Sequence, residues 1–345
     1  MNVLVDIAHP GHVHFYRPLI EQLRAKDHGV TVAARDLPTA RRLLDFYGIS
    51  HVVVGRGAAV RTARSTWRMV AELLAHNYGV AKLIREDGID ICTSIGGTYM
   101  IYAARLNGCR SVVFTDTETA RTANRITFPF ADRIVTPPGF SGLCPPRKHH
   151  VYEGSHELVY LHPDAFSPDV THVKPHGLQP EGYVVFRLSA WGAAHDIGQQ
   201  GLSEDTLLTL ADSIENHGLR VVIVPEGDVH PSLRSRVLKL NPAHFHHVLA
   251  FAAGCVTEGA TTAAEACLLG TRAIYVNPVQ PQYTRALTVH PCFRMVNPRD
   301  CDAILATLEA LLQQPDPRSA CIQYTRAHCD HALLLNALLA QIVTA

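Results

Sequence analysis

The chain has 345 residues, of which 47% are hydrophobic and 18% are charged, and its 31 Lys and Arg balance its 31 Asp and Glu. Domains mostly hold about 100 to 200 residues, so this length predicts two domains. The composition excludes a disordered or fibrous chain, and the balanced charge excludes a global electrostatic field that would attract nucleic acid or an anionic membrane.

The sequence carries no signal for a membrane or an export pathway. No apolar run reaches the roughly 18 residues that span a bilayer, and the first residues lack the basic and hydrophobic regions of a signal peptide. We therefore expect a cytoplasmic protein. The nine cysteines are odd in number and contain no C-x-x-C pair, which favours reduced thiols over disulfides or a zinc site.

Strands and helices are predicted to alternate along the first part of the chain, which is typical of a doubly wound parallel sheet. The hydrophobic pattern predicts strands at 2–7, 30–34, 51–54, 89–93, 111–115 and 133–135, and helices at 15–26, 39–47, 66–85 and 99–106. Turn-forming residues and histidines fill the segment 137–180, and we place the crossing between two domains there.

The same alternation resumes after this segment. Strands are predicted at 183–188, 219–224, 254–257 and 273–276, and helices at 204–215, 262–269, 303–312 and 318–342. We predict an α/β protein with two Rossmann-like doubly wound domains at 1–165 and 166–325, and a final helix at 326–345 that packs back on the first domain. Ligands of such sheets bind beyond the carboxyl ends of the strands, so we expect a site where the two domains face each other.

The loop after the first strand reads His9-Pro10-Gly11-His12-Val13-His14 and leads into a helix. Glycine allows close backbone approach, a helix N-terminus offers free N–H groups, and imidazoles transfer protons near pH 7. His9, Gly11, His12 and His14 are therefore candidate site residues. A metal site is an alternative, which the lack of an acidic or cysteine partner nearby in sequence disfavours, and simple capping and packing is another.

A strand, a turn of small residues and a helix follow one another in the second domain. Small residues let phosphate oxygens reach the amides at a helix N-terminus, and threonine hydroxyls add donors. This pattern predicts a diphosphate site, with a carboxylate one turn further along that suits a ribose hydroxyl pair. The alternative is that Glu258 and Thr261 only cap the helix. The candidates are Glu258, Gly259, Ala260, Thr261, Thr262 and Glu265.

The loop after the strand at 183–188 is a third candidate. An arginine there is suited to neutralising a phosphate, and a tryptophan is suited to stacking on a base or sugar, although a tryptophan is also a common core residue. The candidates in this loop are Arg187, Ser189, Trp191, His195 and Asp196.

Two acids follow the strand at 111–115. Asp116 or Glu118 is suited to act as a base, although acids also cap helices. Gly97 ends another strand of the first domain and is a position where a ligand can approach the backbone.

These motifs resemble the GT-B superfamily, which includes the peptidoglycan N-acetylglucosaminyltransferase and the non-hydrolysing UDP-N-acetylglucosamine 2-epimerases. The resemblance rests on Gly11-His12-Val13 and on the run from Glu258 through Glu265 to Gly270. The chain resembles the domain-of-unknown-function family 354 more closely and over nearly its whole length. That likeness is carried by 9–15, 34–36, 116–118, 124–129, Trp191, His195-Asp196 and 270–277.

The resemblance implies a role for each matching position. Gly259, Thr261 and Thr262 would hold the nucleotide diphosphate, Glu265 would hold the ribose, and Gly11 and His12 would face the sugar and acceptor. The chain departs from the epimerases at Gly97, where those enzymes carry an aspartate, and at Arg121-Thr122, where they carry acids. Because two proton-handling carboxylates are absent, epimerisation is the weaker hypothesis.

We therefore expect a metal-independent glycosyltransferase with a nucleotide-sugar donor, a UDP-sugar, and an acceptor that the sequence does not identify, either a glycan or a small molecule. His12 is the first choice for the base, and Asp116 or Glu118 the second. No cofactor, nucleic-acid partner or transmembrane segment is expected. A nucleotide-sugar 2-epimerase or hydrolase, and a non-catalytic sugar-nucleotide binding protein, stay open, as does a homodimer.

Overall fold

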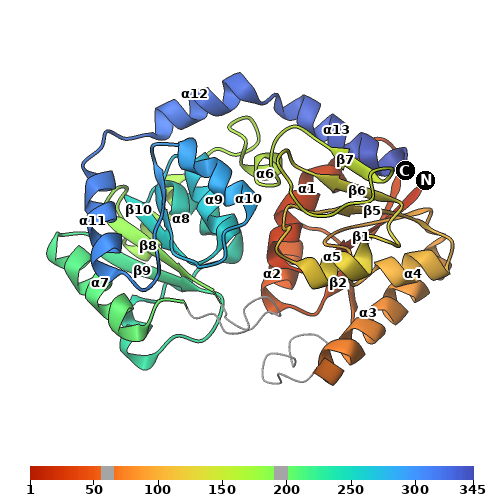
Figure 1. The fold of residues 1–345 in the computed structure, drawn as a ribbon, viewed down its shortest axis with the longest axis horizontal. Coiled ribbons are helices and arrows are strands. Elements are labelled where there is room, and N and C mark those ends of the chain that lie inside the picture. Colours follow the sequence, from red (N-terminus) through yellow and green to blue (C-terminus); the bar gives the residue numbers. More distant parts are fainter. Residues whose placement is uncertain (56–65, 190–200) are drawn as a thin grey trace. The chain divides into compact units, whose positions relative to one another are not determined.

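The computed structural model describes residues 1–55, 66–189 and 201–345, with side chains of the helix that begins at Thr66 described from Met69 onward. The chain forms two compact units (Figure 1): unit 1 is Met1–Tyr160 with Cys329–Ala345, and unit 2 is Leu161–His328. The sequence placed the domain limits at 165 and 325. Each unit is a parallel sheet covered by helices, so the predicted α/β class with two Rossmann-like domains is confirmed.

Unit 1 contains a seven-stranded sheet with the order β3-β2-β1-β4-β5-β6-β7, in which each pair of neighbours is parallel. The strand β7 was not predicted, because it is only three residues long and lies in the turn-rich segment that we assigned to the crossing. The strands are β1 (Asn2–Ile7), β2 (Gly29–Arg35), β3 (Val52–Val54), β4 (Ile91–Ile95), β5 (Arg110–Phe114), β6 (Arg133–Thr136) and β7 (His149–Val151).

Helices cover both faces of this sheet. The helices are α1 (Pro10–Ala25), α2 (Pro38–Phe46), α3 (Thr66–Asp87), α4 (Ile101–Leu106), α5 (Arg121–Thr127), α6 (Leu158–Leu161) and α13 (His331–Val343). Helix α1 packs with α2 and α13 on one face, while α3 and α4 build the core on the other (Figure 1). The helix α1 begins at Pro10 rather than at the predicted Phe15. His9 caps it through Nδ1, and proline fits the first helical position, where its missing N–H costs nothing.

Unit 2 contains a five-stranded parallel sheet with the order β12-β11-β10-β8-β9. Helices α7 and α11 build the core on one face, and α8, α9 and α12 pack together on the other. The strands are β8 (Tyr183–Leu188), β9 (Arg220–Pro225), β10 (Gly254–Thr257), β11 (Arg272–Tyr275) and β12 (Phe293–Met295). The helices are α7 (Glu204–Asn216), α8 (Phe245–Ala250), α9 (Ala260–Leu268), α10 (Gln282–Ala286), α11 (Cys301–Leu312) and α12 (Arg318–His328).

The last part of the chain, predicted as one helix from 318 to 342, forms two helices. Helix α12 belongs to unit 2 and α13 to unit 1. The break occurs at Asp330, whose side chain accepts a hydrogen bond from the N–H of Leu333 and caps α13. Helix α13 then packs against α1 and β4. The end of the chain therefore completes the fold of unit 1.

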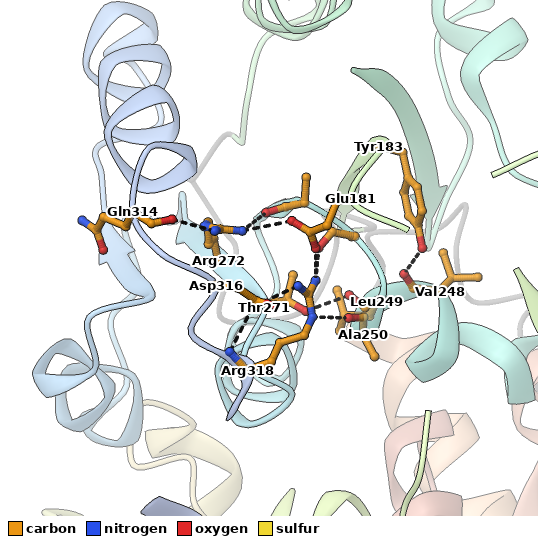
Figure 2. A network of polar contacts seen from close by, with 12 residues as sticks. Glu181, Tyr183, Val248, Leu249, Ala250, Thr271, Arg272, Gln314, Asp316 and Arg318 are labelled. Atoms are coloured by element: carbon orange, nitrogen blue, oxygen red, sulfur yellow. Dashed lines mark hydrogen bonds and ion pairs between the residues drawn. The ribbon is translucent and has the colours of Figure 1, made fainter. Parts of the chain in front are cut away.

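A polar network fixes the start of α12 to unit 2 (Figure 2). Arg318 donates to the carbonyl oxygens of Ala250 and Ala252 and pairs with Glu181. Arg272, at the start of β11, also pairs with Glu181 and donates to the carbonyl oxygen of Gln314. These residues lie at the amino ends of the strands, at the opposite edge from the post-strand loops, so we assign the network a structural role.

In the ranges that the structure describes, no helix is both long and apolar enough to cross a membrane. All nine cysteines are free thiols.

Candidate functional site

The loops at the centre of each sheet carry the candidate residues. In unit 1 the strand order reverses between β1 and β4, and in unit 2 it reverses between β8 and β10. At such switch points the loops diverge to opposite faces and leave a crevice beyond the carboxyl ends of the strands, where ligands bind. The loop after β1 leads to His9 and His12, and the loops after β8 and β10 hold Ser189 and Gly259.

The first turns of α1 hold four of the candidates in three different environments. His9 is the N-cap, and its Nδ1 accepts a hydrogen bond of 3.2 Å from the N–H of Gly11. His12 is partly exposed, and its Nδ1 accepts a bond of 3.3 Å from the N–H of Ala8. His14 is buried, stacks on Tyr160 and meets Tyr47 edge-on. His14 therefore packs the unit, while His12 faces other titratable groups.

Asp116 lies just beyond β5 and pairs with a histidine that the sequence did not single out. Nδ1 of His156 is 3.0 Å from Oδ2 of Asp116, and the hydroxyl of Thr117 donates to Oδ1 over 2.7 Å. His156 packs edge-on against Phe15 of α1 and stacks on Tyr152 with ring planes 5° apart. No local pattern marks His156, because it lies among the turn formers of 137–180 and meets Asp116 only in the folded chain.

The groups around this pair alter one another's protonation. Burial lowers the pKa of His12 well below its ordinary value, and the neighbouring His9 and His156 lower it further. Burial also opposes ionisation of the Asp116–His156 pair, but their mutual attraction outweighs it. The pKa of Asp116 is therefore lowered and that of His156 raised. Burial raises the pKa of Tyr152 well above its ordinary value, so Tyr152 stays protonated.

Two unit 1 candidates remain, Gly97 after β4 and Glu118 after β5. Gly97 is buried with φ of +66°, and a Cβ there would lie 2.6 Å from Cγ2 of Val113, so this position admits no side chain. At the neighbouring Gly96 no atom lies within 4 Å of the Cβ position. The loop therefore has open space at Gly96 and none at Gly97. Glu118 lies beside Gly142, with its Cβ 3.4 Å from where a Cβ of Gly142 would stand.

In unit 2 the turn after β10 is shaped as the sequence predicts. Gly259 is the N-cap of α9, and as a glycine it offers no side-chain acceptor to the first N–H groups of the helix. Its own N–H donates to Oγ1 of Thr257 over 3.0 Å. A Cβ on Gly259 would meet the hydroxyls of Thr262 and Ser189 at 3.8 and 3.9 Å. The hydroxyls of Thr257, Thr262 and Ser189 thus lie around the Cβ position of Gly259 at the start of α9, while Thr261 is exposed and Ala260 partly exposed.

The two glutamates of this motif are buried and engaged by protein groups. Glu258 accepts hydrogen bonds from the N–H groups of Ser189 and Leu202, at 2.8 and 2.7 Å, so it holds the residue that follows β8 and a residue that precedes α7. Oε1 of Glu265 lies 2.9 Å from Nε2 of His246 on α8, a buried partner that no local sequence pattern singles out. His246 orients the carboxylate that the resemblance assigns to a ribose.

The remaining candidates follow β8. Arg187 donates to the carbonyl oxygen of Val224 and to Oε1 of Glu226 at 2.8 Å, so its charge is already paired. Trp191, His195 and Asp196 lie outside the described residues. Among residues 1–55, 66–189 and 201–345, no group of three or more His, Cys, Asp or Glu side chains is arranged to hold a metal ion.

Comparisons with solved structures identify the fold. An S. aureus MnaA–UDP structure aligns with a TM-score of 0.68 and 11% identity, over 98% of this chain and 94% of that chain. A Neisseria meningitidis UDP-GlcNAc 2-epimerase bound to UDP-GlcNAc aligns with a TM-score of 0.61 and 12% identity, over 95% and 100%. The spinosyn forosaminyltransferase aligns with a TM-score of 0.61 and 16% identity, over 99% of each chain. The chain has the GT-B fold.

Sequence comparison adds a family match for part of this GT-B chain. Residues 1–142 match the family model described as "Protein of unknown function (DUF354)", so the resemblance to that family is confirmed for this region. No curated protein matches the chain significantly. At identities of 11 to 16%, the likeness to the solved structures shows the fold alone.

Proposed function

We propose that the protein is a GT-B glycosyltransferase that takes a nucleotide-activated sugar, a UDP-sugar, as its donor. The observation that carries the proposal is the glycine-capped start of α9, which follows β10 at the switch point of the unit 2 sheet. Uncapped N–H groups and the positive end of a helix dipole suit a diphosphate. Two structures of the same fold contain UDP or UDP-GlcNAc, which supports a uridine nucleotide.

In this proposal the protein itself supplies the charge stabilisation that the leaving diphosphate needs. The first N–H groups of α9 and the hydroxyls of Thr262 and Ser189 would donate hydrogen bonds to the phosphate oxygens and stabilise the negative charge that develops there. Glu265, oriented by His246, would bind the ribose hydroxyls. A divalent cation is not required, because fixed amides and the helix dipole neutralise the diphosphate.

A nucleotide-sugar 2-epimerase is the weaker candidate. The epimerases that the sequence resembles carry an aspartate at the position of Gly97. Here φ of +66° and the close approach to Val113 leave no room for any side chain. A carboxylate therefore cannot be supplied from this position. Product analysis separates the candidates: an epimerase or hydrolase alters the donor sugar without an acceptor, and a non-catalytic binding protein leaves it unchanged.

The test of the proposal is a calorimetric and thermal-shift screen of UDP, GDP, ADP, CDP, TDP and their sugars. Binding at a hundredfold excess over the dissociation constant stabilises the fold by about 2.7 kcal/mol. Gly259→Val is the key variant. The backbone at 259 accepts a side chain, but the added methyl groups enter the space between Ser189 and Thr262. We expect the dissociation constant for UDP to rise at least about tenfold, or about 1.4 kcal/mol.

Ser203→Ala is the matched control, because it removes the side-chain cap of α7 in the same unit and leaves α9 intact. We expect it to lower stability without changing nucleotide affinity. The donor-site proposal is refuted if no nucleotide binds the wild type, or if Gly259→Val binds UDP as tightly as Ser203→Ala does.

A further inference from the structure

The hydrogen bonds of His12 and His156 give these two histidines opposite chemical capacities. Nδ1 of His12 accepts the N–H of Ala8, so the neutral imidazole carries its proton on Nε2 and presents an N–H donor. Nδ1 of His156 faces the carboxylate of Asp116, so the neutral ring carries its proton on Nδ1. Nε2 of His156 then carries no proton and has a lone pair that can accept one. Of the two, His156 is equipped to accept a proton.

The surroundings of His156 support this reading. Its Nε2 and the hydroxyl of Tyr152 are buried and have no hydrogen-bond partner among the groups that the structure describes. Buried polar atoms are normally paired, so two such atoms on stacked rings mark a place where a polar group of a ligand fits. A carboxylate that holds the far nitrogen of an imidazole is also the arrangement that orients a general base and stabilises its protonated form.

We propose that His156, oriented by Asp116, is the catalytic base of unit 1 and accepts the proton of a hydroxyl group on the acceptor. This inference rests on the proposed function and narrows it to a hydroxylated acceptor, a sugar or another alcohol. Nε2 takes the hydroxyl proton as the acceptor oxygen forms a bond to C1 of the donor sugar. The bond between C1 and the diphosphate oxygen breaks, and its electron pair leaves with the nucleoside diphosphate. His12, neutral at pH 7, serves as a hydrogen-bond donor.

The titratable groups that face His156 fix the sign of the expected pH dependence. They are the neutral His12 of α1, Asp116 in the loop after β5, and the neutral Tyr152 and Glu157 in the turn before α6. Burial lowers the pKa of His156, but the carboxylate of Asp116 raises it above its ordinary value. A base acts when deprotonated, so the rate rises with pH through this pKa. Asp116→Asn removes the charge and shifts that rise to lower pH.

The first experiment examines the free protein and needs no substrate. Proton-detected long-range ¹⁵N NMR of histidine-labelled protein, assigned with His12→Gln and His156→Gln, reads which nitrogen of each ring is protonated. We expect neutral His156 to carry its proton on Nδ1 and neutral His12 on Nε2, and Asp116→Asn to lower the pKa of His156. A neutral His156 protonated on Nε2 overturns the proposal.

The second experiment follows UDP release from UDP-N-acetylglucosamine, with water and then with glycerol as the acceptor. We expect His156→Gln to slow release at least about a hundredfold while the affinity for UDP stays unchanged, since a general base contributes that much. Unchanged release by His156→Gln overturns the base assignment. If the wild type does not bind UDP, the donor proposal is refuted instead. In that case the NMR result alone decides whether His156 has the tautomer and pKa of a base.

Discussion

At the scale of single residues, the core of unit 1 contains a buried hydrogen-bonded pair that the sequence did not reveal. Asp6 of β1 and His76 of α3 are both 0% exposed, with Oδ1 and Nε2 2.7 Å apart. We expect His76→Leu to destabilise unit 1 by about 3–5 kcal/mol, because it leaves the carboxylate of Asp6 buried without its partner. Urea unfolding followed by circular dichroism measures this loss.

Two variants control that prediction. The double variant Asp6→Val/His76→Leu removes both polar side chains, and we expect it to be more stable than His76→Leu alone. Arg41→Leu breaks the exposed pair with Asp36, and we expect it to cost less than about 1 kcal/mol. If the double variant is instead less stable than His76→Leu, the cost comes from lost packing and not from an unpaired polar group.

At the scale of elements, the start of α12 depends on a close backbone contact. Gly270 has φ of +72°, and a Cβ there would lie 2.5 Å from Cα of Arg318, the residue that the network of Figure 2 fixes to unit 2. Gly218 has φ of +82° and no atom within 4 Å of its Cβ position. Alanine meets backbone strain at both positions, and it meets a steric clash only at Gly270.

We therefore expect Gly270→Ala to destabilise unit 2 by about 1–3 kcal/mol more than Gly218→Ala does. The common strain of the left-handed backbone, about 1–2 kcal/mol, cancels in the comparison. Paired urea titrations of the two variants provide the measurement. Equal losses would show that the contact between Gly270 and Arg318 relaxes without cost.

The helices and strands also show which features of the fold can be predicted from the sequence alone. Hydrophobic periodicity is a local property, so it located β1, β8, β10 and most of the long helices within a few residues. It failed where local chemistry was ambiguous. Residues 9–14 are predicted as a loop, although His9 and Pro10 start α1, and β7 lies among turn formers. The pairs of Asp116 with His156 and of Glu265 with His246 depend on tertiary contacts, which sequence spacing does not encode.

At the scale of the whole molecule, the chain leaves unit 1, builds unit 2 and returns, so the stability of unit 1 depends on residues more than 160 positions beyond its first part. Helix α13 buries Leu338 completely, while Leu333 on the same helix is 67% exposed. We expect Leu338→Ala to destabilise unit 1 by about 2–5 kcal/mol and Leu333→Ala to change stability by less than about 0.5 kcal/mol.

Hydrogen–deuterium exchange with peptide resolution distinguishes which unit responds. Because α13 packs on α1 and β4, Leu338→Ala should increase exchange in peptides from 1–160 and leave those from 161–328 unchanged. Leu333→Ala, with the same change in side chain and the same helix, controls for helix propensity. Increased exchange in α12 and the rest of unit 2, with unit 1 protected, would contradict the assignment of the final helix to unit 1.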